Sequence, residues 1–152
     1  MTTTSTTTPV YTVAKYKALE THNGVAYTAD IVKDGRKVGS VEQEGRGGCN
    51  RYWFDDAAER VAFVEFARTQ SVHDFEPEDV FMERLISVLE FGRMRRIPFV
   101  FAADGDPFET GSVRQGPSGM TFAQLKAGLA AQHADKQPRL FDRSVGDFVP
   151  VV

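Results

Sequence analysis

Apolar and polar residues alternate in short runs over the first third of the chain, a pattern typical of strands in an antiparallel sheet. Between Thr12 and Phe54 the pattern predicts four strands. The dipeptides Asn23-Gly24 and Asp34-Gly35 lie between predicted strands. Both are favoured at the centre of two-residue hairpins, because type I′ turns need positive φ at both positions. The segment is therefore predicted to form an antiparallel β-meander.

The two turns also predict the pairing of the strands. Lys33 is expected opposite Arg36, and His22 opposite Val25. The resulting pairs are Ile31 with Val38, Tyr16 with Ile31, and Ala18 with Ala29, which together form one apolar face.

Two positions fit this register less simply. Val41 falls on the other face, where Gly39 would permit a bulge. The fourth strand, CNRYWF, is apolar on both faces, so we expect it to be central or covered.

After Phe54 the apolar period becomes helical. Asp56 precedes Glu59 at capping-box spacing and opens a helix that is expected to reach about Thr69. A second helix should begin at Pro77, a favoured first-turn residue, and end before Pro98. The expected core stripes are Ala58, Val61, Ala62 and Phe66 in the first helix and Phe81, Leu85, Val88 and Leu89 in the second.

The remaining chain predicts a short hairpin and one more helix. Residues 99–102 form a strand, Asp104 to Pro107 a turn, and residues 108–115 a returning strand. Thr121 and Gln124 repeat the capping-box spacing and open a helix to about His133, and the residues after it look irregular.

This order of elements predicts an α+β fold: an N-terminal antiparallel β-meander followed by two helices, a short β-hairpin and a C-terminal helix. Residues 1–9 are rich in threonine and are expected to be a flexible tail. No linker interrupts the rest, so we expect residues 10–152 to form a single domain.

Composition narrows the function classes. The 152 residues suffice for a sizeable core, and the formal net charge of -3 gives no overall basic field for nucleic acid. One cysteine cannot form an intramolecular disulfide or a cysteine-based metal site. No apolar run approaches the roughly 20 residues of a membrane span. We therefore expect a cytoplasmic protein with no metal, no cofactor and no membrane partner.

The segment GRGGCNR is the main candidate for binding. Its glycines would free the backbone to direct amides at an anion, and the neighbouring side chains would add hydrogen bonds and stacking. The candidate ligand- or partner-binding residues are Arg46, Gly47, Gly48, Asn50, Arg51, Tyr52 and Trp53. The simpler alternative is that these glycines only turn the chain. The segment is neither a Walker A loop nor a dinucleotide fingerprint.

Other patterns offer weaker candidates. Cys49 lies between arginines, which would lower the pKa of its thiol, although a cysteine on a strand is more often a small buried side chain. Residues 93–96 hold three arginines that suit phosphate or a helix dipole, and Arg114 would join them if the fold allows. The acidic stretch 73–79 suits a basic partner or a solvated helix start. Asp104, Asp106 and Glu109 lack the full calcium-loop pattern, and the three histidines show no ligand spacing.

The segment NGVAYTADIVKDGRKVGSVEQEGRGGCNRYWF, residues 23–54, resembles small accessory proteins of actinobacteria and their phages that carry a GVA…DG…VG…GRGG.N.Y pattern. This resemblance implies a compact accessory protein of a bacterium or phage. It assigns no catalytic residue.

These observations leave three functional hypotheses. The first is a non-enzymatic module that recognises a protein or an anionic ligand through the loop Gly45–Arg51. The second is a single-stranded nucleic-acid-binding protein that stacks bases on Tyr52 and Trp53. The third is a small enzyme acting on a nucleotide or phosphorylated substrate, for which the sequence offers no general base. The sequence leaves the oligomeric state open.

Overall fold

The computed structural model describes residues 8–46, 48–70 and 76–151. The chain forms two compact units, residues 1–86 and 87–152, and the boundary falls inside one continuous helix. Most of the predicted flexible tail, residues 1–7, lies outside the described residues. The single domain expected from the absence of a linker stays a prediction.

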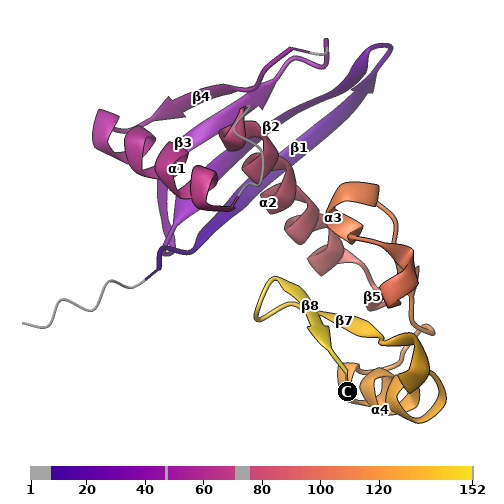
Figure 1. The fold of residues 1–152 in the computed structure, drawn as a ribbon. Helices are drawn as coiled ribbons and strands as arrows, with labels where there is room; N and C mark the ends of the chain where they lie inside the picture. Colours follow the sequence, from indigo (N-terminus) through magenta and orange to yellow (C-terminus); the bar gives the residue numbers. More distant parts are fainter. Residues whose placement is uncertain (1–7, 47, 71–75, 152) are drawn as a thin grey trace, which may run out of the picture. The chain divides into compact units, whose positions relative to one another are not determined.

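The first unit contains a four-stranded antiparallel meander with the order β1-β2-β3-β4 (Figure 1). This confirms the predicted meander and the α+β class. The strands are β1 (Tyr11–Thr21), β2 (Gly24–Lys33), β3 (Arg36–Gln43) and β4 (Arg51–Phe54). β4 is an edge strand rather than a central one, and Trp53 on it is 50% exposed.

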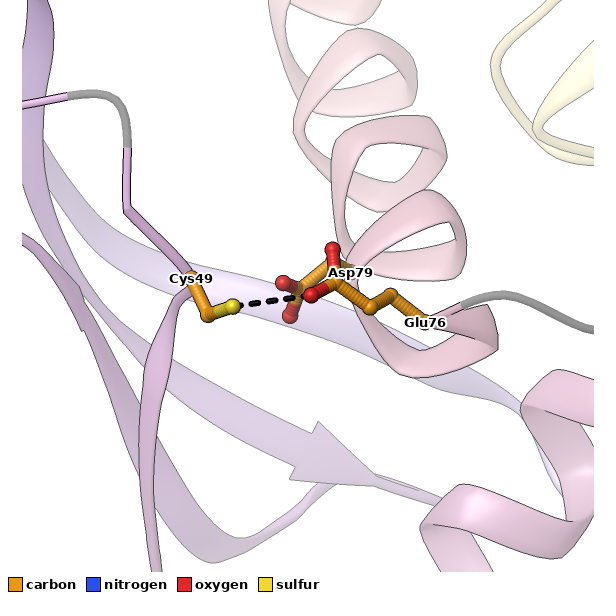
Figure 2. A group of neighbouring side chains, drawn as sticks. All are labelled: Cys49, Glu76 and Asp79. Carbon is orange, nitrogen blue, oxygen red and sulfur yellow. Dashed lines mark hydrogen bonds between the residues drawn. The ribbon is translucent and has the colours of Figure 1, made fainter.

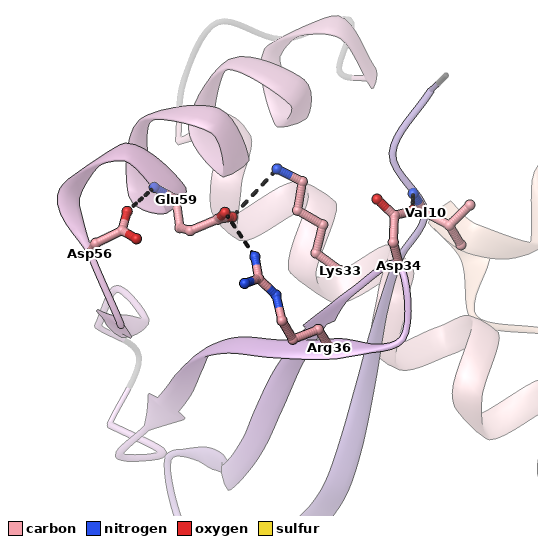
Figure 3. A network of polar contacts seen from close by, with 6 residues as sticks. All are labelled: Val10, Lys33, Asp34, Arg36, Asp56 and Glu59. Carbon is pink, nitrogen blue, oxygen red and sulfur yellow. Dashed lines mark hydrogen bonds and ion pairs between the residues drawn. The ribbon is translucent and has the colours of Figure 1, made fainter. Parts of the chain in front are cut away.

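The Asp34-Gly35 turn forms as predicted. Asp34 has φ 51° and Gly35 has φ 84°, as a type I′ turn requires, and Lys33 pairs with Arg36. The turn is also tied to the start of β1 (Figure 3). The Asp34 amide donates to the carbonyl oxygen of Val10, and Asp34 Oδ1 accepts from the Val10 amide, both at 2.9 Å.

A bulge then shifts this hairpin by one residue. Ile31 lies opposite Gly39, so the predicted pairing of Ile31 with Val38 is wrong. Beyond the bulge Val41 lies opposite Ala29, and all of these apolar side chains are buried. The bulge at Gly39 thus places Val41 on the buried face of the sheet. Without the bulge, Val41 would lie on the opposite face.

The first hairpin differs from its prediction. Thr21 pairs with Gly24, so the two-residue loop is His22-Asn23 and not Asn23-Gly24, and the predicted pairing of His22 with Val25 is wrong. Gly24 has φ 144° at the first position of β2, whereas neither loop residue has a positive φ. The glycine is therefore used beside the turn rather than within it.

A second bulge lies in β1, between Ala14 and Lys17, where Lys15 has φ 52°. Val13 consequently lies opposite Ile31. The predicted pairs Tyr16 with Ile31 and Ala18 with Ala29 are therefore wrong. Because β1 is an edge strand, a bulge and lysines there also discourage pairing with another chain.

Helix α1 (Ala57–Gln70) and the part of α2 (Pro77–Arg93) that belongs to the first unit cover one face of the sheet, here called the inner face (Figure 1). The Tyr11 ring lies 5.2 Å from the Phe63 ring and 5.9 Å from the Phe81 ring, centroid to centroid. The sheet contributes to this core the buried side chains of Tyr11, Val13, Ala29, Ile31, Val38 and Val41.

The helices bury partly different stripes from those predicted. α1 buries Phe63 and Ala67, whereas Val61 is 54% exposed. Phe63 is buried in place of Val61 because its ring contacts aromatic rings from the sheet and from α2. These contacts stabilise the fold more than burial of a valine side chain would. In α2, Phe81 and Leu85 are buried as predicted.

The start of α1 is fixed to the tip of the second hairpin (Figure 3). The Glu59 amide donates to Asp56 Oδ1 at 2.8 Å, which confirms the predicted N-cap. The Glu59 carboxylate also accepts from Lys33 Nζ and from Arg36 Nη2, each at 3.4 Å. Glu59 and Lys33 are mostly buried, so this pairing anchors the helix on the sheet.

The second unit contains a hairpin and a helix where the sequence predicted them. The predicted extent of the returning strand, residues 108–115, is wrong, because Pro107–Thr110 are helical and only Arg114–Gln115 form a strand. β5 (Pro98–Val100) pairs with β6 (Arg114–Gln115), and between them lie η1 (Ala102–Asp104) and the short α3 (Pro107–Thr110). α4 (Phe122–Gln132) begins with the predicted capping box, in which the side chains of Thr121 and Gln124 each accept from the other's amide.

The C-terminal residues are not irregular as predicted. After η2 (Ala134–Lys136) they form β7 (Arg139–Asp142) and β8 (Asp147–Pro150), which complete a sheet of order β6-β5-β7-β8. The apolar content of these strands is only two or three residues each, which is too short a pattern to recognise in sequence. Among the described residues, no helix has the length and apolarity that crossing a bilayer would require.

Candidate functional site

The glycine-rich loop between β3 and β4 is folded back on one side chain, Gln43. Gln43 Nε2 donates to the carbonyl oxygen of Gly48 and to Asn50 Oδ1, both at 2.9 Å. Its Oε1 accepts from the Gly45 amide at 3.2 Å. Both oxygen and nitrogen of this amide are thus used to brace the loop from within.

Gly45 is required by the packing of the loop. It is buried with φ 79°, and a Cβ there would lie 2.9 Å from the Ala26 amide nitrogen. Its carbonyl oxygen lies 2.8 Å from Thr21 Oγ1, which also lies 2.9 Å from the carbonyl oxygen of Gly24. The loop is therefore fastened to the end of the first hairpin.

Asn50 and Tyr52 point to the inner side and hold the start of α2. The Tyr52 hydroxyl donates to Asp79 Oδ1 at 2.7 Å, and the Asn50 amide donates to Asp79 Oδ2 at 3.3 Å. Asn50 Nδ2 donates to the Tyr52 hydroxyl oxygen at 3.2 Å. The backbone amide of Asn50, which directly follows the glycine-rich segment, thus binds the carboxylate of Asp79 within the protein.

Burial raises the pKa values of both Tyr52 and Asp79. The pKa of Tyr52 is raised far above its ordinary value, mainly because the phenol is buried. The pKa of Asp79 is also raised, mainly by burial, and the hydrogen bonds from Tyr52 and Asn50 act in the opposite direction. Tyr52 therefore stays a neutral donor. Its ring lies 5.8 Å from the Phe63 ring, centroid to centroid, so it packs within the protein and is no free stacking surface.

Arg46, Arg51 and Trp53 belong to the other face of the sheet, here called the outer face. Its strand residues are Lys17 and Leu19 of β1, Ala26, Thr28 and Asp30 of β2, Ser40 and Glu42 of β3, and Arg51 and Trp53 of β4. Tyr52 and Trp53 are neighbours in one strand, so their side chains lie on opposite faces and cannot form one stacking platform.

The two arginines differ in their partners. Arg51 Nη2 lies 2.7 Å from Glu44 Oε1 in an exposed ion pair. Arg46 forms no ion pair with any residue that the structure describes, and it is exposed. Within the described part of the chain, Arg46 is thus the one of the two whose charge is not balanced by a carboxylate.

The outer face contains two shallow depressions that share Lys17, Thr28 and Glu42. One, of about 470 Å³, is also lined by Leu19 and Arg46. The other, of about 520 Å³, extends along the sheet to Ser40 and Trp53. Arg46 and Trp53 therefore lie at the two ends of one continuous exposed surface.

Cys49 lies near the start of α2 (Figure 2). It is exposed, so the prediction of a small buried side chain is wrong. Its Sγ donates to Glu76 Oε1 at 2.8 Å, and one donor atom each from Cys49, Glu76 and Asp79 lie within 4.8 Å of one another. These three residues could hold a metal ion, whereas no metal site was expected from the sequence.

The electrostatics of Cys49 oppose the sequence prediction. The pKa of its thiol is raised, first by the hydrogen bond to Glu76 and then by the charges of Glu76, Asp79 and Glu78. The expected lowering by the flanking arginines is therefore wrong. The arginines are close in sequence, but the charges that act on the thiol are those of Glu76 and of Glu78 and Asp79 in the first turn of α2.

The structure thus divides the predicted site. Asn50 and Tyr52 support the inner side, Arg46, Arg51 and Trp53 border the outer face, and Gly47 lies outside the described residues. Sequence reasoning missed Gln43, Glu76 and Asp79 as partners of the loop. Only the acidic start of the second helix gave a signal for the last two, and the rest of that acidic stretch, residues 73–75, is also outside the described residues.

In the second unit, the guanidinium of Arg114 is bound by a carboxylate of the same chain. Its Nε and Nη2 donate to the two carboxylate oxygens of Asp104 at 2.7 Å and 3.0 Å. Its guanidinium also lies 4.6 Å from the centre of the Phe101 ring. Arg114 therefore joins β6 to η1.

Comparison with protein-family models, with curated proteins and with solved structures found no match to this chain.

Proposed function

We propose that the protein is a non-enzymatic binding module that docks another protein on its outer face, beside the loop Gly45–Arg51. The observation that carries the proposal is the pair Arg46 and Trp53. One is an arginine without an ion pair among the described residues, and the other is a tryptophan with half its surface exposed. Both border the same exposed surface.

The chemistry of these anchors favours a protein partner. Tryptophan and arginine are the side chains most enriched among the residues that dominate protein–protein binding. Trp53 lies on β4, which is paired with β3 along its whole length, so the backbone that carries Trp53 is already fixed before a partner covers it. The braced loop likewise fixes the backbone that carries Arg46.

The charges of the outer face weigh against nucleic acid. Asp30 is paired with Lys15 and Lys37, and Glu42 lies between Lys17 and Arg51 in the strand order. A phosphate backbone laid across this surface would meet these carboxylates as well as the cations, whereas a protein surface can match both signs.

The enzyme hypothesis gains no support from the loop. Its reactive side chain, Cys49, has a raised pKa, so at neutral pH the thiol is protonated and is a poor nucleophile. A single exposed thiol suits a reducing, cytoplasmic setting. An accessory role in a bacterium or phage is part of the proposal and rests on the sequence pattern of residues 23–54.

The test compares retention of proteins from a lysate of the cells that carry the gene. The bait is the full chain, either wild type or with Arg46→Ala and Trp53→Ser together. The matched control removes the same chemistry from the exposed surface of α1, with Val61→Ser and Arg68→Ala. We expect one protein to be retained by the wild type and the control, and its affinity to fall at least about tenfold in the outer-face variant.

Two further ligands distinguish protein binding from nucleic-acid and nucleotide binding. Single-stranded oligonucleotides and a panel of nucleotides are each titrated against the wild-type protein at low and high salt. Tight oligonucleotide binding with a steep salt dependence would replace the proposal with the nucleic-acid hypothesis. Equal retention by the outer-face variant and the wild type would remove the outer face from the account.

A further inference from the structure

We propose that Cys49, Glu76 and Asp79 form a binding site for a thiophilic divalent cation such as zinc or cadmium, on a different surface from the outer face. The three residues come from two segments far apart in sequence, the loop before β4 and the start of α2. Their donor atoms nevertheless lie within 4.8 Å of one another (Figure 2). The ligand atoms of one tetrahedral cation lie roughly 3 to 4 Å apart, so binding would draw these three side chains slightly closer together.

The donor set selects the kind of cation. One sulfur and two carboxylate oxygens combine a soft ligand with two hard ones, a set that suits zinc or cadmium and is poor for calcium or magnesium, which take oxygen alone. Three protein ligands leave a position for water, and the cluster borders an open depression of about 410 Å³. The cation and its water would therefore have room.

The carboxylates around the start of α2 favour a cation, although the N-terminal end of a helix by itself repels one. The start of α2 carries a partial positive charge of about half a unit. Glu76, Glu78 and Asp79 place three carboxylates around it, all of which line the depression. Two guanidiniums also line it, Arg51 and Arg60, but Arg51 is already paired with Glu44.

Asp79 is held ready for such a role by groups outside the cluster. The Tyr52 hydroxyl and the Asn50 amide each donate one hydrogen bond to its carboxylate. Each carboxylate oxygen has a second lone pair, so both retain a site for a cation. Outer donors of this kind orient the ligands of protein metal sites.

Binding exchanges a cation for a proton. In the structure the Cys49 thiol donates its hydrogen to Glu76. Formation of the sulfur–metal bond breaks the sulfur–hydrogen bond and releases that proton to solvent, with no change of oxidation state. Binding should therefore release about one proton and should tighten as the pH rises.

The experiment titrates the reduced full chain with cadmium chloride alone and follows the ultraviolet charge-transfer absorption of the cadmium–thiolate bond. We expect one cation per chain and release of about one proton in a weakly buffered solution. Zinc should displace the cadmium and remove the band. Calcium and magnesium should leave the band unchanged.

Variants locate the site. Cys49→Ser should abolish the band, and Glu76→Gln should weaken cadmium binding at least about tenfold. The matched control is Glu78→Gln, which removes the same charge from the same helix turn but lies outside the cluster, and should change the affinity by no more than about fivefold. Equal weakening by Glu76→Gln and Glu78→Gln would show only diffuse attraction of the ion and overturn the proposal, as would the absence of a band in the wild type. Either result leaves the outer-face proposal untouched.

Discussion

At the residue scale, two glycines of one loop have different physical tasks. Gly45 is buried at positive φ with backbone atoms against it, whereas Gly48 has open space around the place of a Cβ and no positive φ. Only the first is fixed by conformation and packing. The glycine richness of the loop is therefore partly structural, as the simpler interpretation of the sequence held.

This difference predicts opposite outcomes for the same substitution. Gly45→Ala should lower the free energy of unfolding by about 1–3 kcal/mol, because alanine is strained at that φ and its Cβ meets the Ala26 amide. Gly48→Ala should leave it unchanged or raise it by up to about 1 kcal/mol, since it only restricts the unfolded chain. Urea unfolding measures both, and equal losses at the two positions would contradict the account.

The Cys49 thiol offers a second residue-scale prediction. Its raised pKa means that less thiolate is present at a given pH than in a free cysteine, so alkylation should be slow below the ordinary thiol pKa. Glu76→Gln removes the largest cause of the shift and should lower the pKa and speed alkylation at pH 8.

Arg51→Ala serves as the control for that change. It should alter the alkylation rate little, because Arg51 is paired with Glu44 and is no main cause of the Cys49 shift. The rates are measured with iodoacetamide as a function of pH. A wild-type thiol that reacts faster than free cysteine would contradict the structure.

At the scale of elements, sequence predicted structures that depend on neighbours along the chain. Asp34-Gly35 and the Thr121 capping box are local, and both form as expected. The turn predicted at Asn23-Gly24 lies one residue earlier, at His22-Asn23. A glycine fits either within a turn or directly after it, and no local rule chooses between these two positions. The contacts of Cys49 with the start of α2 are long-range and left no periodic signal.

An ion pair between two elements gives a prediction with a defined pH window. Hydrogen bonds from Arg114 hold the pKa of Asp104 down to about 2, from an ordinary 3.8. Because the folded-state pKa is depressed, the stabilisation is present above about pH 4 and is lost as the pH falls from there toward 2. Arg114→Ala should move this pKa back toward its ordinary value.

Arg114→Lys is the graded comparison for that pair. Lysine keeps the charge but cannot donate from two fixed nitrogens, so the Asp104 pKa should lie between those of the wild type and the alanine variant. Carboxyl carbon shifts in an NMR titration report the value. No change in the alanine variant would show that other groups hold Asp104 ionised.

At the scale of the whole molecule, one helix belongs to both compact units. α2 runs from Pro77 to Arg93, and the boundary between the units lies at Ile86 and Ser87. Its side chains Leu85 and Ile86, which precede the boundary, are buried. Its side chain Phe91, which follows the boundary, belongs to the hydrophobic core of the second unit. A helix shared in this way should transmit unfolding from one unit to the other.

We therefore predict a single unfolding transition. Trp53 is the only tryptophan and reports the first unit, whereas far-ultraviolet circular dichroism also follows the helices and strands of the second. The two probes should give coincident curves in the wild type. Ser87→Pro, which breaks the helix at the boundary at a cost of about 3 kcal/mol, should separate them. Separate transitions in the wild type would show two independent domains.

The same tryptophan tests the central claim, that the outer face binds a protein. Its emission and its quenching by acrylamide are measured before and after addition of the purified retained protein, in a tryptophan-free form. The account predicts a shift of Trp53 emission to shorter wavelength and protection from quenching, both weakened at matched concentrations by Arg46→Ala. A complex that forms with full affinity while Trp53 emission and quenching stay unchanged would contradict it.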